Sequence, residues 1–317
     1  MRVAKPSPAV AGCPVALLAA VISLLTLGLA SACGLARWTE TPSPHGTVRT
    51  TRQYMPGYAV DVLTPSVPPR APAPVVVTMH SCCGSRADLA VLAEGLAAAG
   101  AVVLNADWVG IRPGGYPLAY RQASCLVRTA RRWAAAYGGD PRRVTLLGWG
   151  DGAMIGAVAA LDAEDFQGGC PVAAGSPLPD AFVGVSAFLG WPVGLDGRVD
   201  AGPFADRAGP FFGGDPQSAA GAWRAGDPYA MLDRRPGFPM SLVTSVYEPL
   251  LAGNRRFAAA ARARCHPVAV TAAPYDGDPS MIAPRTEEGR TTIRVTLAAA
   301  AGGGGRAPGC SAGHPSS

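Results

Sequence analysis

The stretch that most constrains the fold is Val144–Gly156, VTLLGWGDGAMIG. It opens with a run of apolar and β-branched residues, Val144–Leu147, which is typical of a buried strand. Small and apolar residues from Ala153 onward predict a helix. Between the two lie three glycines at alternate positions: Gly148, Gly150 and Gly152. A strand that enters a helix through such a tight turn predicts a sheet with helices packed against it.

The rest of the chain repeats this alternation of strands and helices. A hairpin is predicted from Val48–Met55 and Tyr58–Leu63 around a Pro-Gly turn. Further strands are expected at Val75–Met79, Ala101–Asn105, Phe182–Leu189, Met240–Val246 and Val268–Ala273. Helices are expected at Arg86–Ala99, Leu118–Tyr137, Ala252–Arg264 and Thr286–Ala301. The order predicts an α/β domain over residues 47–301, with a mostly parallel central sheet and helices on both faces.

Two segments lack the hydrophobic periodicity of strands and helices. Residues 190–227 are rich in Gly and Pro, and we expect a lid or a long ordered loop there. Residues 302–317 are of low complexity, and we expect a disordered tail.

Composition and motifs exclude several functions. The chain has 317 residues, of which 49% are hydrophobic, so it can bury a large core. Its net charge of +5 is mild, and no arginine cluster is interleaved with aromatic residues, which argues against nucleic acid as a partner. No glycine-rich nucleotide motif and no Cys/His metal spacing is present. We therefore expect neither a cofactor nor a metal site.

The N-terminus has the features of an export signal. Arg2 and Lys5 precede an uncharged apolar run, Val15–Ala32, which ends in small residues. This predicts a signal peptide over residues 1–32. The next residue is Cys33, and the ASA–Cys junction is similar to a bacterial lipobox, in which that cysteine is lipidated. Residues 33–46 are then a linker between the lipid anchor and the domain. Plain secretion and a retained transmembrane anchor are the alternatives.

Export would place the other cysteines in an oxidising compartment. Apart from Cys13 and Cys33 there are six: Cys82, Cys83, Cys125, Cys170, Cys265 and Cys310. An even number favours disulfides, although some can be buried free thiols. Our hypothesis is a bridge from Cys82 or Cys83 to Cys125, which would tie the loop after one strand to the next long helix.

Four segments give the chain a resemblance to a known superfamily. They are VVVTMH followed by SCCGS, YGGDPRRVTLLGWGDGA, DPYAMLDRRPGFPMSLVTSVYEPLL and FAAAARARCHPVAVTAAPYDGDPSMI. In this order they resemble the α/β-hydrolases, in the branch of dienelactone-hydrolase-like enzymes and small exported esterases. The resemblance spans Val48–Ala301 and implies an α/β-hydrolase fold. The stretch GWGDG then stands where the family has its nucleophile elbow, G-x-S-x-G.

The resemblance also implies where a catalytic triad would lie. Gly150 takes the place of the serine nucleophile, Glu248 that of the acid, and Asp278 that of the histidine. Acyl transfer by serine needs a hydroxyl and a base that removes its proton. Since both are replaced, the resemblance implies a degenerate site. We interpret the aspartates near position 278 as turn formers rather than metal ligands.

Other residues near the elbow take their roles from the same resemblance. Ser81, Cys82 and Asp151 fall in the region that forms the oxyanion hole, and His80 is expected to be structural. Asp151 is also an alternative nucleophile, because related dehalogenases and epoxide hydrolases use aspartate. It stands one residue late for that role, in a frame that puts Trp149 where a small residue is needed.

These observations leave two main hypotheses and a third. The first is an exported, lipid-anchored protein of the cell envelope without catalytic activity. It would bind a small-molecule ligand or an envelope protein. The second is an active hydrolase of ester-like substrates that uses Asp151 or an unconventional set of residues. The third is an envelope scaffold whose pocket has no role.

Overall fold

The computed structural model describes residues 40–43, 46–163, 166–172, 175–190, 205–246, 250–274 and 279–302. The chain divides into two compact units at residue 38, and every described residue belongs to the second, Thr39–Ser317. The predicted signal peptide, Cys33 and residues 303–317 of the predicted tail lie outside the described residues, as do Glu248 and Asp278. Among the described helices, none has the length and apolar character that a membrane crossing requires.

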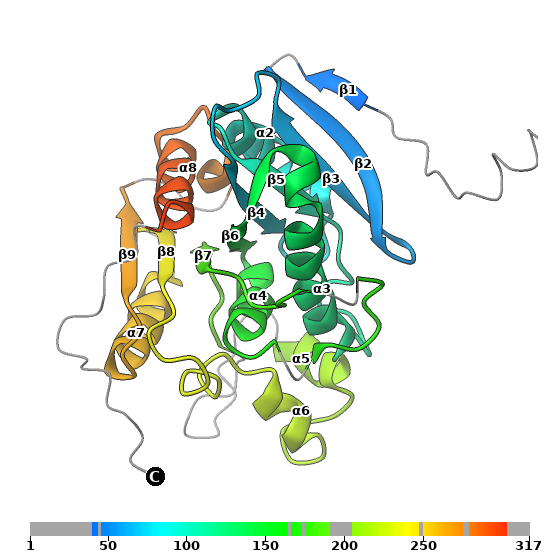
Figure 1. Ribbon diagram of the computed structural model, residues 1–317. Coiled ribbons are helices and arrows are strands. Elements are labelled where there is room, and N and C mark those ends of the chain that lie inside the picture. Colours follow the sequence, from blue (N-terminus) through cyan, green and yellow to red (C-terminus); the bar gives the residue numbers. More distant parts are fainter. Residues whose placement is uncertain are drawn as a thin grey trace, which may run out of the picture. The chain divides into compact units, whose positions relative to one another are not determined.

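A nine-stranded sheet forms the centre of the domain, in the order β1-β2-β3-β5-β4-β6-β7-β8-β9 (Figure 1). The strands are β1 (Glu40–Ser43), β2 (Thr47–Met55), β3 (Tyr58–Pro65), β4 (Ala73–Met79), β5 (Val102–Ala106), β6 (Gly139–Trp149), β7 (Ala181–Val185), β8 (Met240–Ser245) and β9 (Val268–Ala273). The first three pair antiparallel, and β3 pairs antiparallel with β5. From β5 to β9 all neighbours are parallel.

The helices follow the strands in alternation. They are η1 (Arg86–Leu89), α2 (Ala90–Ala98), α3 (Leu118–Trp133), η2 (Ala134–Tyr137), α4 (Asp151–Leu161), α5 (Ala205–Phe212), α6 (Ala220–Ala225), α7 (Leu250–Ala263), η4 (Ser280–Ile282) and α8 (Glu287–Ala300). Successive parallel strands cannot be joined by a tight hairpin, so these connections must cross a face of the sheet.

The sheet is buried on both faces, as its apolar runs predict. Side chains alternate between two hydrophobic clusters along each central strand; in β4, for example, Val75 and Val77 join one cluster and Val76 the other. Residues of α3, α4 and α7 line the first cluster, and residues of α2 and α8 line the second. The predicted parallel sheet with helices on both faces is therefore confirmed.

The structure corrects several boundaries. Residues 40–43 of the predicted linker form β1, which pairs with β2. The stretch 190–227, predicted as a lid or loop, contains α5 and α6 among its described residues. Strand β7 ends at Val185 and not at Leu189, because Ser186 has a φ of 43° and leaves the extended conformation.

The predicted bridge from Cys82 or Cys83 to Cys125 is wrong. Cys125 on α3 is bonded to Cys170, which lies 45 residues later in the loop after α4. Helices α3 and α4 pack side by side on the same face of the sheet, which brings the two sulfurs together. Cys265 is also in a disulfide, whereas Cys82 and Cys83 are both free thiols.

Candidate functional site

The turn between β6 and α4 has the geometry of a sharp elbow. Gly150 caps α4 with φ 57° and ψ −119°, a combination that residues other than glycine adopt only under strain. Its N–H donates to the carbonyl of Val185 at 3.0 Å, and its own carbonyl accepts from the N–H groups of Ala153 and Phe188. The tip of the elbow is therefore fixed to β7 and to the first turn of α4.

The two outer glycines fix the register of the elbow. A Cβ placed on Gly148 would lie 2.4 Å from the backbone N and Cα of Ala153. A Cβ on Gly152 would lie 2.3 Å from the carbonyl oxygen of His80. Both contacts are closer than any side chain allows, so these positions must be glycine. Gly150 thus stands at the tip, in the place that the sequence assigned to the nucleophile.

Ser81 occupies the space in front of Gly150. A Cβ built on Gly150 would lie 2.4 Å from the Oγ of Ser81 and 3.0 Å from its Cβ. The hydroxyl of Ser81 therefore lies close to where a nucleophile side chain would begin. Sequence reasoning placed Ser81 in the oxyanion loop but gave no signal of this contact.

Asp151 is the first residue of α4 and is fully buried. Its Oδ2 accepts a hydrogen bond of 3.1 Å from the backbone N–H of Cys82. An oxyanion hole needs free N–H groups directed at the developing negative charge. Here a carboxylate already takes one of the N–H groups of the loop, and its own charge would oppose an oxyanion.

His80 holds the loop from its buried end. Its Nδ1 donates to the carbonyl of Ser81 at 2.7 Å, and its Nε2 accepts from the N–H of Trp108 at 3.4 Å. The indole of Trp108 donates in turn to the carbonyl of His80 at 3.0 Å. Burial lowers the pKa of His80, which favours this neutral form. Both ring nitrogens are engaged, in keeping with a structural role.

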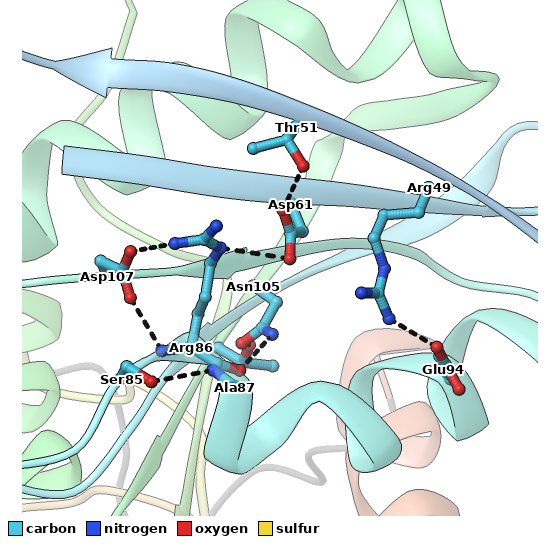
Figure 2. Close-up of polar contacts among 10 residues, drawn as sticks. Arg49, Thr51, Asp61, Ser85, Arg86, Ala87, Glu94, Asn105 and Asp107 are labelled. Carbon is cyan, nitrogen blue, oxygen red and sulfur yellow. Dashed lines mark hydrogen bonds and ion pairs between the residues drawn. The ribbon is translucent and has the colours of Figure 1, made fainter. Parts of the chain in front are cut away.

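A cluster of charged side chains anchors the other end of the loop (Figure 2). The guanidinium of Arg86 lies between Asp61 on β3, with Nε 3.2 Å from Oδ2, and Asp107 after β5. Its backbone N–H donates to Asp107 at 2.8 Å, and its carbonyl accepts from Asn105 at 2.7 Å. Thr51 completes the cluster through a 2.6 Å hydrogen bond to Asp61. Residues 80–86 are thus held at both ends.

Sequence reasoning missed this cluster, although a signal for it was present. Asp61 interrupts the otherwise apolar run VDVL in a predicted strand. A carboxylate on a buried strand needs a partner, because an unpaired buried charge is very costly. That partner is Arg86, which the sequence placed only at the start of a helix.

The structure brings together four of the predicted site residues: Ser81, Cys82, Gly150 and Asp151. It does not describe Glu248 or Asp278, whose positions therefore remain predictions. Within the described parts of the chain, no group of three or more His, Cys, Asp or Glu side chains is arranged to hold a metal ion.

Comparison with solved structures identifies the fold. Esterase B from Lactobacillus rhamnosis superposes with a TM-score of 0.65 and 15% identity, over 90% of this chain and 96% of that one. A thermophilic esterase from Thermogutta terrifontis gives 0.61 at 17% identity, over 85% and 97%. A truncated carbohydrate esterase from gut microbiota gives 0.61 at 14% identity, over 76% and 90%. The chain has the α/β-hydrolase fold.

Sequence comparisons add nothing to this likeness. No protein-family model matches the chain, and no curated protein matches it. At 14–17% identity, the structural neighbours establish the fold alone. The activity must therefore be argued from the site.

Proposed function

We propose that this chain is a non-catalytic α/β-hydrolase-fold protein of the cell envelope that binds a ligand or a protein partner. The proposal rests on the observation that the residue at the tip of the elbow is Gly150. This position has the backbone of a nucleophile elbow, with φ 57° and ψ −119°, but no side chain that could attack a carbonyl.

Two contacts around the elbow support the same conclusion. The hydroxyl of Ser81 takes the space into which a side chain on Gly150 would project. The carboxylate of Asp151 accepts the N–H of Cys82, one of the groups expected to stabilise an oxyanion. Acyl transfer would therefore lack both its nucleophile and part of its electrostatic stabilisation.

The alternative, an active hydrolase with Asp151 as nucleophile, is less well supported. Asp151 lies one residue beyond the tip, inside the first turn of α4. It is fully buried, and it already binds the backbone of the oxyanion loop. An ester carbonyl would have to displace Cys82 from this carboxylate before attack.

Ester hydrolysis by the purified chain tests the proposal. We expect no hydrolysis of short p-nitrophenyl esters above the buffer rate, and no labelling by a fluorophosphonate. Asp151→Asn and Ser81→Ala should leave this background unchanged. The proposal is wrong if the chain hydrolyses such esters and Asp151→Asn or Ser81→Ala abolishes the rate while the melting temperature stays the same.

A reconstruction tests whether the rest of the machinery persists. Gly150→Ser alone should give no activity, because it restores no base and because its Cβ displaces the hydroxyl of Ser81, which lies 2.4 Å away. The variant that adds Ser81→Gly removes this contact, and Asp278→His restores a base at the predicted position. Gain of esterase activity only in the triple variant would show that the elbow still supports acyl transfer and that the Asp151 carboxylate does not prevent it.

The envelope location is tested separately through Cys33. With a lipid on Cys33, the chain should partition into detergent and sediment with membranes. Mass spectrometry of the N-terminal peptide should show a lipid on Cys33 in the wild type and none in Cys33→Ala. A wild-type chain without this lipid mass would refute lipidation at this residue.

A further inference from the structure

Cys82 and Cys83 form a pair of neighbouring thiols in the oxyanion loop. Adjacent side chains in an extended chain point to opposite sides. Here Cys83 has a φ of 62°, in the left-handed region, and this reverses the direction of its side chain. The two Sγ atoms consequently lie 3.2 Å apart. A small movement would bring them to bonding distance.

Arg207 of α5 lies against both sulfurs, although it stands more than a hundred residues further along the chain. Its Nη1 is 3.3 Å from the Sγ of Cys82 and also donates to the Sγ of Cys83. The guanidinium charge suits sulfur atoms that carry negative charge during thiol exchange. The same charge would repel a metal cation, so the pair is better suited to redox chemistry than to metal binding.

The two thiols differ in their surroundings. Cys83 is exposed, whereas Cys82 is partly buried. Burial, together with the Asp151 carboxylate, raises the pKa of the Cys82 thiol. An incoming reagent therefore meets Cys83 first, and Cys82 is placed to react second.

We propose that Cys82 and Cys83 are a thiol-oxidation site that closes to a vicinal disulfide by exchange with a disulfide donor. Cys83 gives up its proton, and its sulfur attacks the S–S bond of the donor, forms a mixed disulfide and releases one donor thiolate, which takes up that proton. Cys82 then loses its proton, attacks the Cys83 sulfur and expels the second donor thiolate. Two protein thiols are oxidised, and the donor is reduced to two thiols.

This inference is independent of whether the elbow is catalytic. It concerns the loop in front of Gly150, which His80 and Arg86 hold at its two ends. Formation of the disulfide between Cys82 and Cys83 would remove the thiol of Cys82 as a hydrogen-bond partner of Asp151. Oxidation would thus change the polar groups at the centre of the candidate site.

Peptide mass spectrometry of the purified full chain tests the proposal. The chain is equilibrated with reduced and oxidised glutathione at a series of ratios, quenched with acid and alkylated with N-ethylmaleimide. Trypsin then releases residues 71–86, a peptide whose only cysteines are Cys82 and Cys83. As the buffer becomes more oxidising, we expect the doubly alkylated peptide to give way to an unalkylated one that has lost two hydrogens.

Matched variants separate the two steps. Cys82→Ser should stop at a single glutathione adduct on Cys83, and Cys83→Ser should react several-fold more slowly than the wild type. Arg207→Gln should slow ring closure several-fold. Arg224→Gln, an exposed arginine on the neighbouring helix α6, should leave the rate unchanged.

Three results would overturn the proposal. The peptide could stay doubly alkylated at every ratio, end with two glutathione adducts, or become linked to another peptide. Melting temperatures of the variants, measured in parallel, show that each one is folded when it is assayed.

Discussion

The close packing of the elbow against the end of β4 and His80 predicts a large effect of Gly152→Ala. Gly152 lies in the first turn of α4, where a Cβ would stand 2.3 Å from the carbonyl oxygen of His80 and 2.6 Å from that of Met79. An ordinary contact is about 1 Å longer. Because both obstacles are backbone atoms, α4 would have to move away from the end of β4.

The change in the free energy of unfolding can be estimated and compared with the change at a second glycine in a helix. Overpacking of a buried site costs about 3 kcal/mol when the backbone must shift. Alanine regains about 1 kcal/mol of helix propensity, so Gly152→Ala should lower the free energy of unfolding by about 2 kcal/mol. Gly253 in α7 is the matched control, since a Cβ at this position would have the end of Arg256, at 4.0 Å, as its nearest neighbour. Gly253→Ala should raise stability by about 1 kcal/mol.

Thermal unfolding of the two variants measures the difference. At about 2 °C per kcal/mol for a domain of this size, the two melting temperatures should differ by about 6 °C. Gly57→Ala adds a second control: its φ is 79° and nothing lies within 4 Å, so it reports the cost of the conformation alone, about 1 kcal/mol. If Gly152→Ala melts as high as Gly253→Ala, helix α4 and the loop are not packed as described.

Four further perturbations have defined outcomes. Replacing Cys125 and Cys170 by serine opens a disulfide between residues 45 apart and should cost about 4 kcal/mol of stability in urea unfolding. Arg86→Met leaves two carboxylates without their shared cation and should cost about 2 kcal/mol, since its side chain is 29% exposed. Arg142→Met, at an ion pair whose arginine is 86% exposed, should not change the urea midpoint. Burial lowers the pKa of His80, so its contribution to stability is present above pH ~6.5 and is lost as the pH falls through the lowered pKa; His80→Asn should flatten this part of the stability–pH profile.

The sheet could be predicted from the sequence because its signal is local. Apolar runs such as Val75–Met79 mark strands buried on both faces, and the Pro-Gly turn marks the hairpin of β2 and β3. The partner of Cys125 could not be predicted in this way. It depends on how α3 and α4 pack on one face, which is set by side chains far apart in the sequence.

The candidate site, too, could be predicted only in part from the sequence. Three alternate glycines indicated the register of the elbow, because a close backbone approach excludes every other residue. The hydroxyl of Ser81 in front of Gly150 could not be foreseen, since it depends on how the loop after β4 meets the loop after β6. The position of Arg207 beside the two thiols was harder still to predict, because its segment of the sequence has no clear helical or strand periodicity.

The conformation of Gly150 explains why glycine can occupy the tip of the elbow. A serine held at φ 57° and ψ −119° stores about 1–3 kcal/mol of backbone strain, which an enzyme tolerates because the side chain does chemistry there. Glycine adopts the same angles without this strain. The hydrogen bonds of the tip to Val185, Ala153 and Phe188 are made by the backbone and do not need a side chain. Glycine therefore holds the turn between β6 and α4 against β7 through its backbone alone, without the strain that a side chain at this position would carry.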